Sequence, residues 1–234
     1  GIDLPGEVRG VLPSTEWKRK TYKRPEQQKW YGGETISLGI GQGYNTFTML
    51  QLATATSVLA NGGVKNVPHV VRATQDALNH QELPRPVPEA LALGFKPEHL
   101  NVVRDGLVGV TTGGTSAQVF AGAAYTSAGK TGTAQAVTIG QKDKYNASKL
   151  SEHQRDHALY MAFAPADKPK IALAVIVENA GFGAAHAAPI ARRVFDYWLL
   201  DQYPSAEDIA ATQNGQTSRP VGTPRQKNDV PLTP

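Results

Sequence analysis

The sequence predicts an α+β fold in which helices flank an antiparallel sheet. Residues 46–63 and 100–115 each place apolar side chains at helical spacing before a glycine-rich stop. Two apolar runs, residues 157–164 and 170–178, are joined by a turn with two prolines and Asp167, which is the pattern of a β-hairpin. With 234 residues, 40% of them hydrophobic, the chain is long enough to bury the core of such a fold.

The two early helices have clear ends and one apolar face each. The first ends at an Asn-Gly-Gly sequence, and its face carries Met49, Leu52 and Leu59 together with interleaved alanines. The second is closed by Thr-Thr-Gly-Gly-Thr at residues 111–115. Its apolar positions are Leu100, Val103, Leu107 and Val110. Both faces should belong to the core.

A third helix is predicted at the end of the folded part. Pro189 suits the first helical turn, and the apolar stripe consists of Ile190, Val194, Tyr197 and Trp198. From Asp201 onward most residues are Pro, Gly, Ser, Thr, Gln, Asn or charged, and such a segment is too polar to offset the entropy of ordering. We therefore assign residues 1–200 to the folded part and expect residues 201–234 to be a disordered polar tail.

A third strand is predicted beside the hairpin. The segment around Lys130 lies between the second helix and the hairpin, and its flanks, Ala123 to Tyr125 and Ala134 to Ile139, are compatible with a strand. The hairpin strands are continuously apolar, which indicates that both faces of the sheet are covered. The expected core is therefore an antiparallel sheet between layers of helices.

The segment around Lys130 gathers a cation and several hydroxyl groups. Successive side chains of a strand point to opposite faces, so Lys130 and Thr131 cannot meet above the sheet, but both can border a cleft at its edge. Gly132 lets another backbone or a ligand come close, and the backbone N–H of Thr133 can point outward as an unpaired donor. A cation, hydroxyls and a free N–H together suit a carboxylate next to a reacting carbonyl.

Composition excludes several classes of function. The formal charge is only +4 and the one basic run, WKRKTYKR at residues 17–24, is short, which argues against a nucleic-acid partner. The chain has no cysteine, so disulfides, thiolate metal sites and a cysteine nucleophile are excluded. No run approaches the roughly 20 apolar residues of a membrane span, and the first residues do not have the pattern of a signal peptide.

Three further motifs are interpreted as structural. His153 and His157 stand four residues apart, but no third metal ligand is evident, so we predict no metal and no cofactor. The sequence GIGQGYN at residues 39–45 lacks the lysine of a phosphate-binding loop, and we interpret it as a tight loop that positions the following helix. His186 has no assignable Asp partner and is interpreted as a loop histidine.

Several segments, taken in order, resemble the class B penicillin-binding proteins, and the resemblance covers nearly all of residues 1–200. The Lys130–Thr133 sequence is similar to the Lys-Thr-Gly motif on the edge strand of penicillin-binding proteins and serine β-lactamases. The other segments are GIDLPGEVRGVLPS at 1–14, WYGGETISLGIGQGYNTFTMLQLATATSVLANGG at 30–63, VVRDGLVGVTTGGT at 102–115 and ALYMAFAPAD at 158–167. Within this class, the basic run followed by WYGGETISLGIGQGY most resembles the penicillin-binding protein 2 group of cell-elongation transpeptidases.

The resemblance implies a D,D-transpeptidase that cross-links peptidoglycan stem peptides through an acyl-serine and is a target of β-lactams. It also implies that Lys130 supplies positive charge, that the hydroxyls of Thr131 and Thr133 hold the terminal carboxylate of the substrate, and that Gly132 completes the binding strand. The backbone N–H of Thr133 would then form half of the oxyanion hole.

The sequence departs from the family at the nucleophile. The family serine lies in Ser-x-x-Lys on a helix, and a second motif is Ser-x-Asn, which does not occur in this chain. The one Ser-x-x-Lys match is Ser127 to Lys130, which overlaps the strand motif, and in a strand those two side chains face opposite ways. We expect the nucleophilic serine to lie outside this chain, which is interpreted as a C-terminal fragment that cannot fold or act alone.

The expected partners also follow from the resemblance. They are stem peptides, β-lactams, the N-terminal part of the same protein, a glycan-polymerising membrane partner and the elongation machinery. The expected location is the periplasmic face of the bacterial inner membrane. Two alternatives stay open: a β-lactamase-like serine hydrolase, and a non-catalytic penicillin-binding or partner-binding module.

Overall fold

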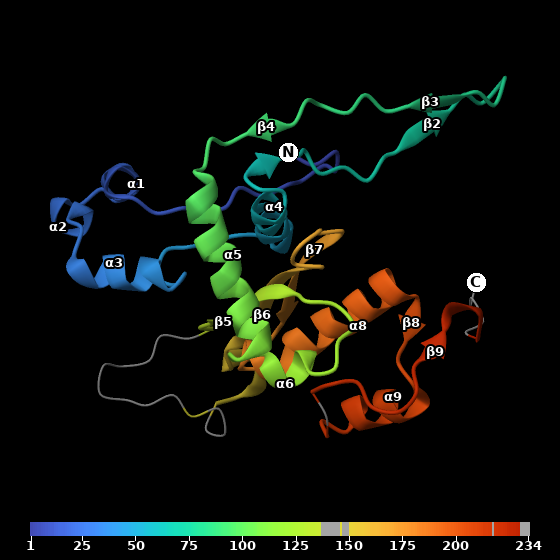
Figure 1. Ribbon diagram of the computed structural model, residues 1–234. Helices are drawn as coiled ribbons and strands as arrows, with labels where there is room; N and C mark the ends of the chain where they lie inside the picture. Colours follow the sequence, from blue (N-terminus) through green and yellow to red (C-terminus); the bar gives the residue numbers. More distant parts are fainter. Residues whose placement is uncertain (137–145, 147–149, 217, 230–234) are drawn as a thin grey trace.

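The computed structural model describes residues 1–136, 146, 150–216 and 218–229, and its architecture confirms the predicted α+β class (Figure 1). A three-stranded antiparallel sheet lies at the centre, in the order β5-β6-β7. Its strands are β5 (Ala128–Ala134), β6 (His157–Ala164) and β7 (Ile171–Val177). The predicted hairpin is β6 and β7, and the predicted third strand, β5, pairs with β6 from Ala128↔Phe163 to Ala134↔His157.

β5 is shorter than the sequence pattern indicates. Residues 123–125 precede it outside the strand, with a bend at 124–125, and the strand ends at Ala134. The remaining part of the expected flank, residues 137–139, lies outside the described residues.

Helices and short strand pairs surround this sheet. The α-helices are α1 (Thr15–Thr21), α2 (Pro25–Gln28), α3 (Gly32–Gly39), α4 (Met49–Ala60), α5 (Pro97–Thr112), α6 (Ala117–Phe120), α7 (Gly183–His186), α8 (Ala188–Leu200) and α9 (Ala206–Gln213). Short antiparallel pairs join β1 (Val64–Lys65) to β4 (Leu91–Ala92), β2 (Ala73–Gln75) to β3 (Glu82–Pro84), and β8 (Gln202–Tyr203) to β9 (Arg225–Gln226). The β2–β3 pair extends away from the body of the molecule as a long arm (Figure 1).

The two early helices stop where the sequence predicts, α4 at Ala60 before Asn61 and α5 at Thr112 before Gly113, whereas the pattern leaves their starts open. In α4 the hydroxyl of Thr48 accepts the N–H of Gln51, whose side chain accepts the N–H of Thr48, and this reciprocal pair fixes the start of the helix. α5 begins with Pro97, which has the backbone angle of a first helical residue, and ends at Gly113. Both ends are therefore determined by local sequence.

Helices cover both faces of the sheet, as the apolar strands predict. On one face Leu107 of α5 packs with Ala128 and Phe163, joined by residues of α4. On the other face Tyr160 packs with Phe120 and with Phe195 of α8. The core is thus split by the sheet into two apolar layers.

Helix α8 packs through a different face from the one its apolar stripe suggests. The stripe is exposed, with Ile190 43% and Trp198 60% accessible. The buried residues include Ala188, Ala191 and Phe195, which pack in the core with Tyr160 of the sheet, and Arg192 and Asp196. Small alanines let the helix approach the strands closely, and the charged pair among these residues is buried because Arg192 binds Asp196 at 2.8 Å and the hydroxyl of Tyr125 donates to the same carboxylate.

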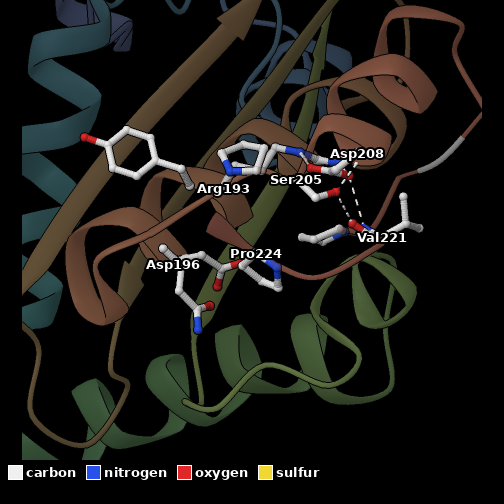
Figure 2. Close-up of a pocket in the computed structure, with 10 residues that line it drawn as sticks. Arg193, Asp196, Ser205, Asp208, Val221 and Pro224 are labelled. Carbon is white, nitrogen blue, oxygen red and sulfur yellow. Dashed lines mark hydrogen bonds and ion pairs between the residues drawn. The ribbon is translucent and has the colours of Figure 1, made fainter. Parts of the chain in front are cut away.

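The segment after Leu200 is expected to be disordered, whereas the structure places β8, α9 and β9 in it. Its centre is a group of residues that we name the C-terminal anchor: Arg193, Ser205, Asp208 and Val221 (Figure 2). Arg193 donates to both oxygens of the Asp208 carboxylate at 2.8 and 2.6 Å, and the N–H of Val221 donates to it at 3.2 Å. Buried charge pairing, which composition does not report, holds a polar segment against α8.

Candidate active site

The Lys130–Thr133 segment forms the middle of β5, at the edge of the sheet that the sequence predicts. Opposite residues of an antiparallel pair alternate between hydrogen-bonded and non-hydrogen-bonded positions, so the N–H and C=O of one residue point to the same side of the strand. The carbonyl oxygen of Thr133 accepts a hydrogen bond from Nε2 of Gln42 at 3.2 Å, from a residue that does not belong to the sheet. The N–H of Thr133 therefore also points toward the open edge.

Lys130 lies exposed beside this edge. Its Nζ donates to the carbonyl oxygen of Thr131 at 2.8 Å, so the ammonium group is held next to the strand rather than extended into solvent. The hydroxyl oxygen of Thr131 lies 3.4 Å from that of Thr115, in the glycine-rich turn after α5. A cation and two hydroxyls are thus gathered along one stretch of strand.

A cavity of about 210 Å³ borders this stretch. Its walls include the whole of residues 130–134, Ile40 and Gly41 of the loop after α3, and Met49 and Leu52 of α4. The walls are mostly apolar while the strand supplies the polar groups, which is the usual composition of a small-ligand site. This arrangement suits an anionic peptide end lying along the strand.

A close backbone contact lies beside Gly132, and the glycine that permits it is Gly183 of α7. A Cβ atom added to Gly183 would lie 2.1 Å from the carbonyl oxygen of Leu159 and 2.6 Å from that of Gly132. Gly183 therefore lets the first turn of α7 press against the backbone of the β5–β6 pair, whereas a Cβ atom at Gly132 would lie 3.2 Å from the Cβ atom of Leu159. This packing supports the backbone of Gly132 within the pair.

Burial changes the acidity of one nearby side chain. Tyr160, opposite Thr131 in the ladder, is almost completely buried, and desolvation raises the pKa of its phenol to about 12. The phenol is therefore neutral at physiological pH and acts as a packing group.

The other candidate residues have structural positions. Ser127 is 2% exposed, which leaves its hydroxyl closed to any substrate. His157 begins β6 and its Nδ1 accepts the N–H of Asn179 at 2.9 Å, while His153 lies exposed in a short 3₁₀ helix. His186 ends α7 and is exposed. In the part of the chain that the structure describes, no group of three or more His, Asp or Glu side chains is placed to hold a metal.

Three residues of this site escape the sequence analysis: Gln42, Thr115 and Gly183. Each is far from Lys130 in the sequence and meets β5 only in the folded chain. A weak signal exists for Gln42, since it stands between two glycines, and both have positive φ in the structure. The expected tight loop at residues 39–45 is present, and it carries a side chain to the edge strand as well as leading into α4.

Comparisons with known proteins agree with this geometry. The family model of the penicillin binding protein transpeptidase domain matches residues 1–196. The chain is 42% identical over 210 residues to the peptidoglycan D,D-transpeptidase MrdA of Haemophilus influenzae. The aligned part covers 88% of this chain and 31% of that protein. The chain thus spans about a third of the length of the curated relatives that it matches.

Solved structures are similar over the same part. Penicillin-binding protein 2 (PBP2) of Pseudomonas aeruginosa matches with a TM-score of 0.66 and 41% identity, covering 88% of this chain and 40% of that one. PBP2 of Helicobacter pylori in complex with MreC matches with a TM-score of 0.63 and 30% identity, covering 86% of this chain and 33% of that one.

Proposed function

Because this chain belongs to the penicillin-binding protein transpeptidase family, we propose that it is part of a peptidoglycan D,D-transpeptidase that serves cell elongation and rod shape. In that reaction a serine hydroxyl attacks the D-Ala-D-Ala peptide bond of a stem peptide, an ester forms and the last D-alanine leaves. An amine of a neighbouring stem peptide then attacks the ester, which forms the cross-link and restores the serine. β-Lactams acylate the same serine.

The residues of β5 take four roles in this proposal. Lys130 supplies the positive charge, the hydroxyls of Thr131 and Thr133 bind the terminal carboxylate, and Gly132 leaves room for the substrate backbone. The N–H of Thr133 donates to the oxyanion that develops on the attacked carbonyl. The observation that carries the proposal is the orientation of the Thr133 backbone. Its carbonyl oxygen accepts a hydrogen bond from Gln42 at the open edge of β5, so its N–H also points toward that edge.

The nucleophile is proposed to come from a longer protein of which these 234 residues are a part. Ser127 is the only serine in a Ser-x-x-Lys sequence here, and it is buried beside the first residue of β5. Relatives are about three times as long as the matched part, which leaves ample chain for a serine-bearing helix. We assign residues 1–200 to the transpeptidase domain.

Partners and location are proposed on the same basis. PBP2 of Helicobacter pylori has been determined in complex with MreC, and its similarity supports a partner of the elongation machinery for this protein as well. We also propose a glycan-polymerising membrane partner, no nucleic-acid partner, and a place at the periplasmic face of the inner membrane. Across the described residues, no helix combines the length and the apolar character needed to cross a bilayer.

A fluorescent penicillin tests the proposal on the intact protein. We expect covalent labelling of a serine outside this chain, and we expect Lys130→Ala to lower the rate constant of acylation about 10- to 100-fold, because a charged hydrogen-bond partner of the substrate is lost. Lys168→Ala, in the exposed turn between β6 and β7, is the matched control and should label like the wild type.

The same experiment separates the alternatives. Slow release of the label favours a transpeptidase, whereas rapid release indicates a β-lactamase-like hydrolase. A protein that binds penicillin without covalent attachment would be the non-catalytic module. Unchanged labelling of Lys130→Ala would show that β5 does not form the site.

A further inference from the structure

Gln42 reaches the edge of β5 from a loop 91 residues earlier in the chain. Its Nε2 donates to the carbonyl oxygen of Thr133 at 3.2 Å, where the N–H of another strand would donate in a wider sheet. The side-chain amide of Gln42 therefore takes the place of a neighbouring strand at Thr133, the residue whose N–H we assign to the oxyanion. Among the described residues, no other side chain hydrogen-bonds to the backbone of Thr133.

The loop that carries Gln42 is built to fix this side chain. Gly41 and Gly43 on either side have φ of +76° and +74°, a conformation that other residues rarely adopt. The N–H of Gln42 donates to the carbonyl oxygen of Ser37 at 2.9 Å, and its carbonyl oxygen accepts Nδ2 of Asn45 at 2.8 Å. The main chain of Gln42 is therefore held on both sides of its Cα atom.

A buried ion pair braces this loop against α1 and α3. Lys18 is 3% exposed and donates to the carboxylate of Glu34, which also accepts the hydroxyl of Tyr44 at 3.2 Å. The ammonium group of Lys18 lies 5.6 Å from the centre of the Tyr44 ring, a cation–π distance. The bond from Lys18 holds the pKa of Glu34 below its usual range. Tyr44 is two residues from Gln42, so the pair fixes the loop as a unit.

We propose that Gln42 is a positioning residue, which holds the peptide group after Thr133 and thereby aims the N–H of Thr133 at the oxyanion. This inference rests on the function proposed above. An oxyanion donor works only when it lies about 2.7–3.1 Å from the developing charge, so a small rotation of an edge strand weakens it. β5 has no neighbouring strand on this side in the described chain to prevent that rotation, and Gln42 takes that part.

The test uses Gln42→Glu and Gln42→Met in the intact protein with a fluorescent penicillin as the probe. At pH 8 an ionised Glu cannot donate a hydrogen bond, and Met has no donor at all. Both variants should acylate about 3- to 10-fold more slowly than the wild type, with the loss in the acylation rate constant and not in the concentration for half-saturation.

The pH profile distinguishes positioning from packing. A protonated Glu regains a donor, so the ratio of Gln42→Glu to wild type should rise as the pH falls from 8 to 4, through the ordinary Glu pKa of about 4.3, while the ratio for Gln42→Met stays low. Gln28→Glu is the matched control, because Nε2 of Gln28 also donates to a backbone carbonyl, that of Tyr22, at 2.8 Å in a region without contact to β5. It should acylate like the wild type at every pH.

The outcomes are separable. A wild-type protein that takes no label overturns the proposed function and this inference with it. A labelled wild type with Gln42→Met equally fast overturns only the inference about Gln42. Equal pH profiles for Gln42→Glu and Gln42→Met also overturn it, because a purely steric role would not respond to protonation.

Discussion

At the C-terminal anchor Asp208 is fully buried and accepts two hydrogen bonds from Arg193 and one from Val221. At the edge of β5, by contrast, Lys130 is exposed, and among the described residues its ammonium group donates to a carbonyl of its own strand. The anchor satisfies its charges inside the chain, so it can contribute stability but has nothing left to offer a ligand. The β5 edge keeps a cation, hydroxyls and an outward N–H accessible beside a cavity. These accessible polar groups at an unpaired strand edge are the reason why we propose binding at β5 and not at the anchor.

The largest effect is expected at the anchor. Asp208→Ala would leave the partly buried Arg193 guanidinium without its carboxylate and would open a gap at a fully buried position. We expect the free energy of unfolding of the intact domain to fall by about 3–5 kcal/mol, measured by urea denaturation. Lys20→Ala removes an exposed ion pair with Glu16 and should change the stability by less than about 0.5 kcal/mol. Equal losses in the two variants would contradict the assignment of the anchor.

A substitution at Gly183 tests whether the packing of α7 against the β5–β6 pair affects the exposed edge of β5. Gly183→Ala would bring a Cβ atom against the backbone oxygens of Leu159 and Gly132, and we expect a loss of about 1–3 kcal/mol together with slower acylation, because the β5–β6 pair must shift. Gly106→Ala is the control: it lies in α5 with open space around it and should stabilise by about 0.5–1 kcal/mol. If the Gly183→Ala protein is less stable but acylates at the normal rate, the packing of α7 does not control the geometry of the β5 edge.

Alkaline pH tests the buried side of the sheet. The pKa of Tyr160 is about 12 in the folded protein and about 10 in an unfolded chain, so the unfolded state loses its proton first. The associated stability is complete below pH 10 and falls as the pH rises through 12, by roughly 2 kcal/mol. Tyr160→Phe should reduce this decrease, which urea denaturation across the pH range measures. If Tyr160→Phe and the wild type lose the same free energy of unfolding at alkaline pH, the pKa of the Tyr160 phenol is not raised by burial.

The smallest effect is expected at Thr115. Its hydroxyl oxygen lies 3.4 Å from that of Thr131, a long contact, so Thr115→Val should slow acylation by no more than about threefold. Thr112→Val provides the comparison, because the hydroxyl of Thr112 bonds to its own helix at Val108. A larger loss in Thr115→Val than in Lys130→Ala would mean that hydroxyls and not the cation dominate the site.

Local sequence determined a large part of this protein. The helix stops at Asn61 and Gly113, the hairpin of β6 and β7, and the Lys130–Thr133 strand all follow from spacing, stop residues and turn residues, since these act within a few positions along the chain. The order of motifs also predicts the family, and the candidate strand of the site with it.

Tertiary structure decided the rest, because burial and pairing join residues that the sequence keeps apart. The apolar stripe of α8 predicts its packing face incorrectly, since Ala188, Ala191 and Phe195 pack in the core while Trp198 is 60% exposed. A polar segment is ordered through one buried charge pair, between Arg193 and Asp208. Gln42 meets Thr133 across 91 residues, a contact that no local pattern encodes. Local rules fix elements and their chemistry, whereas the fold alone selects which polar groups are buried together and which remain free at an edge.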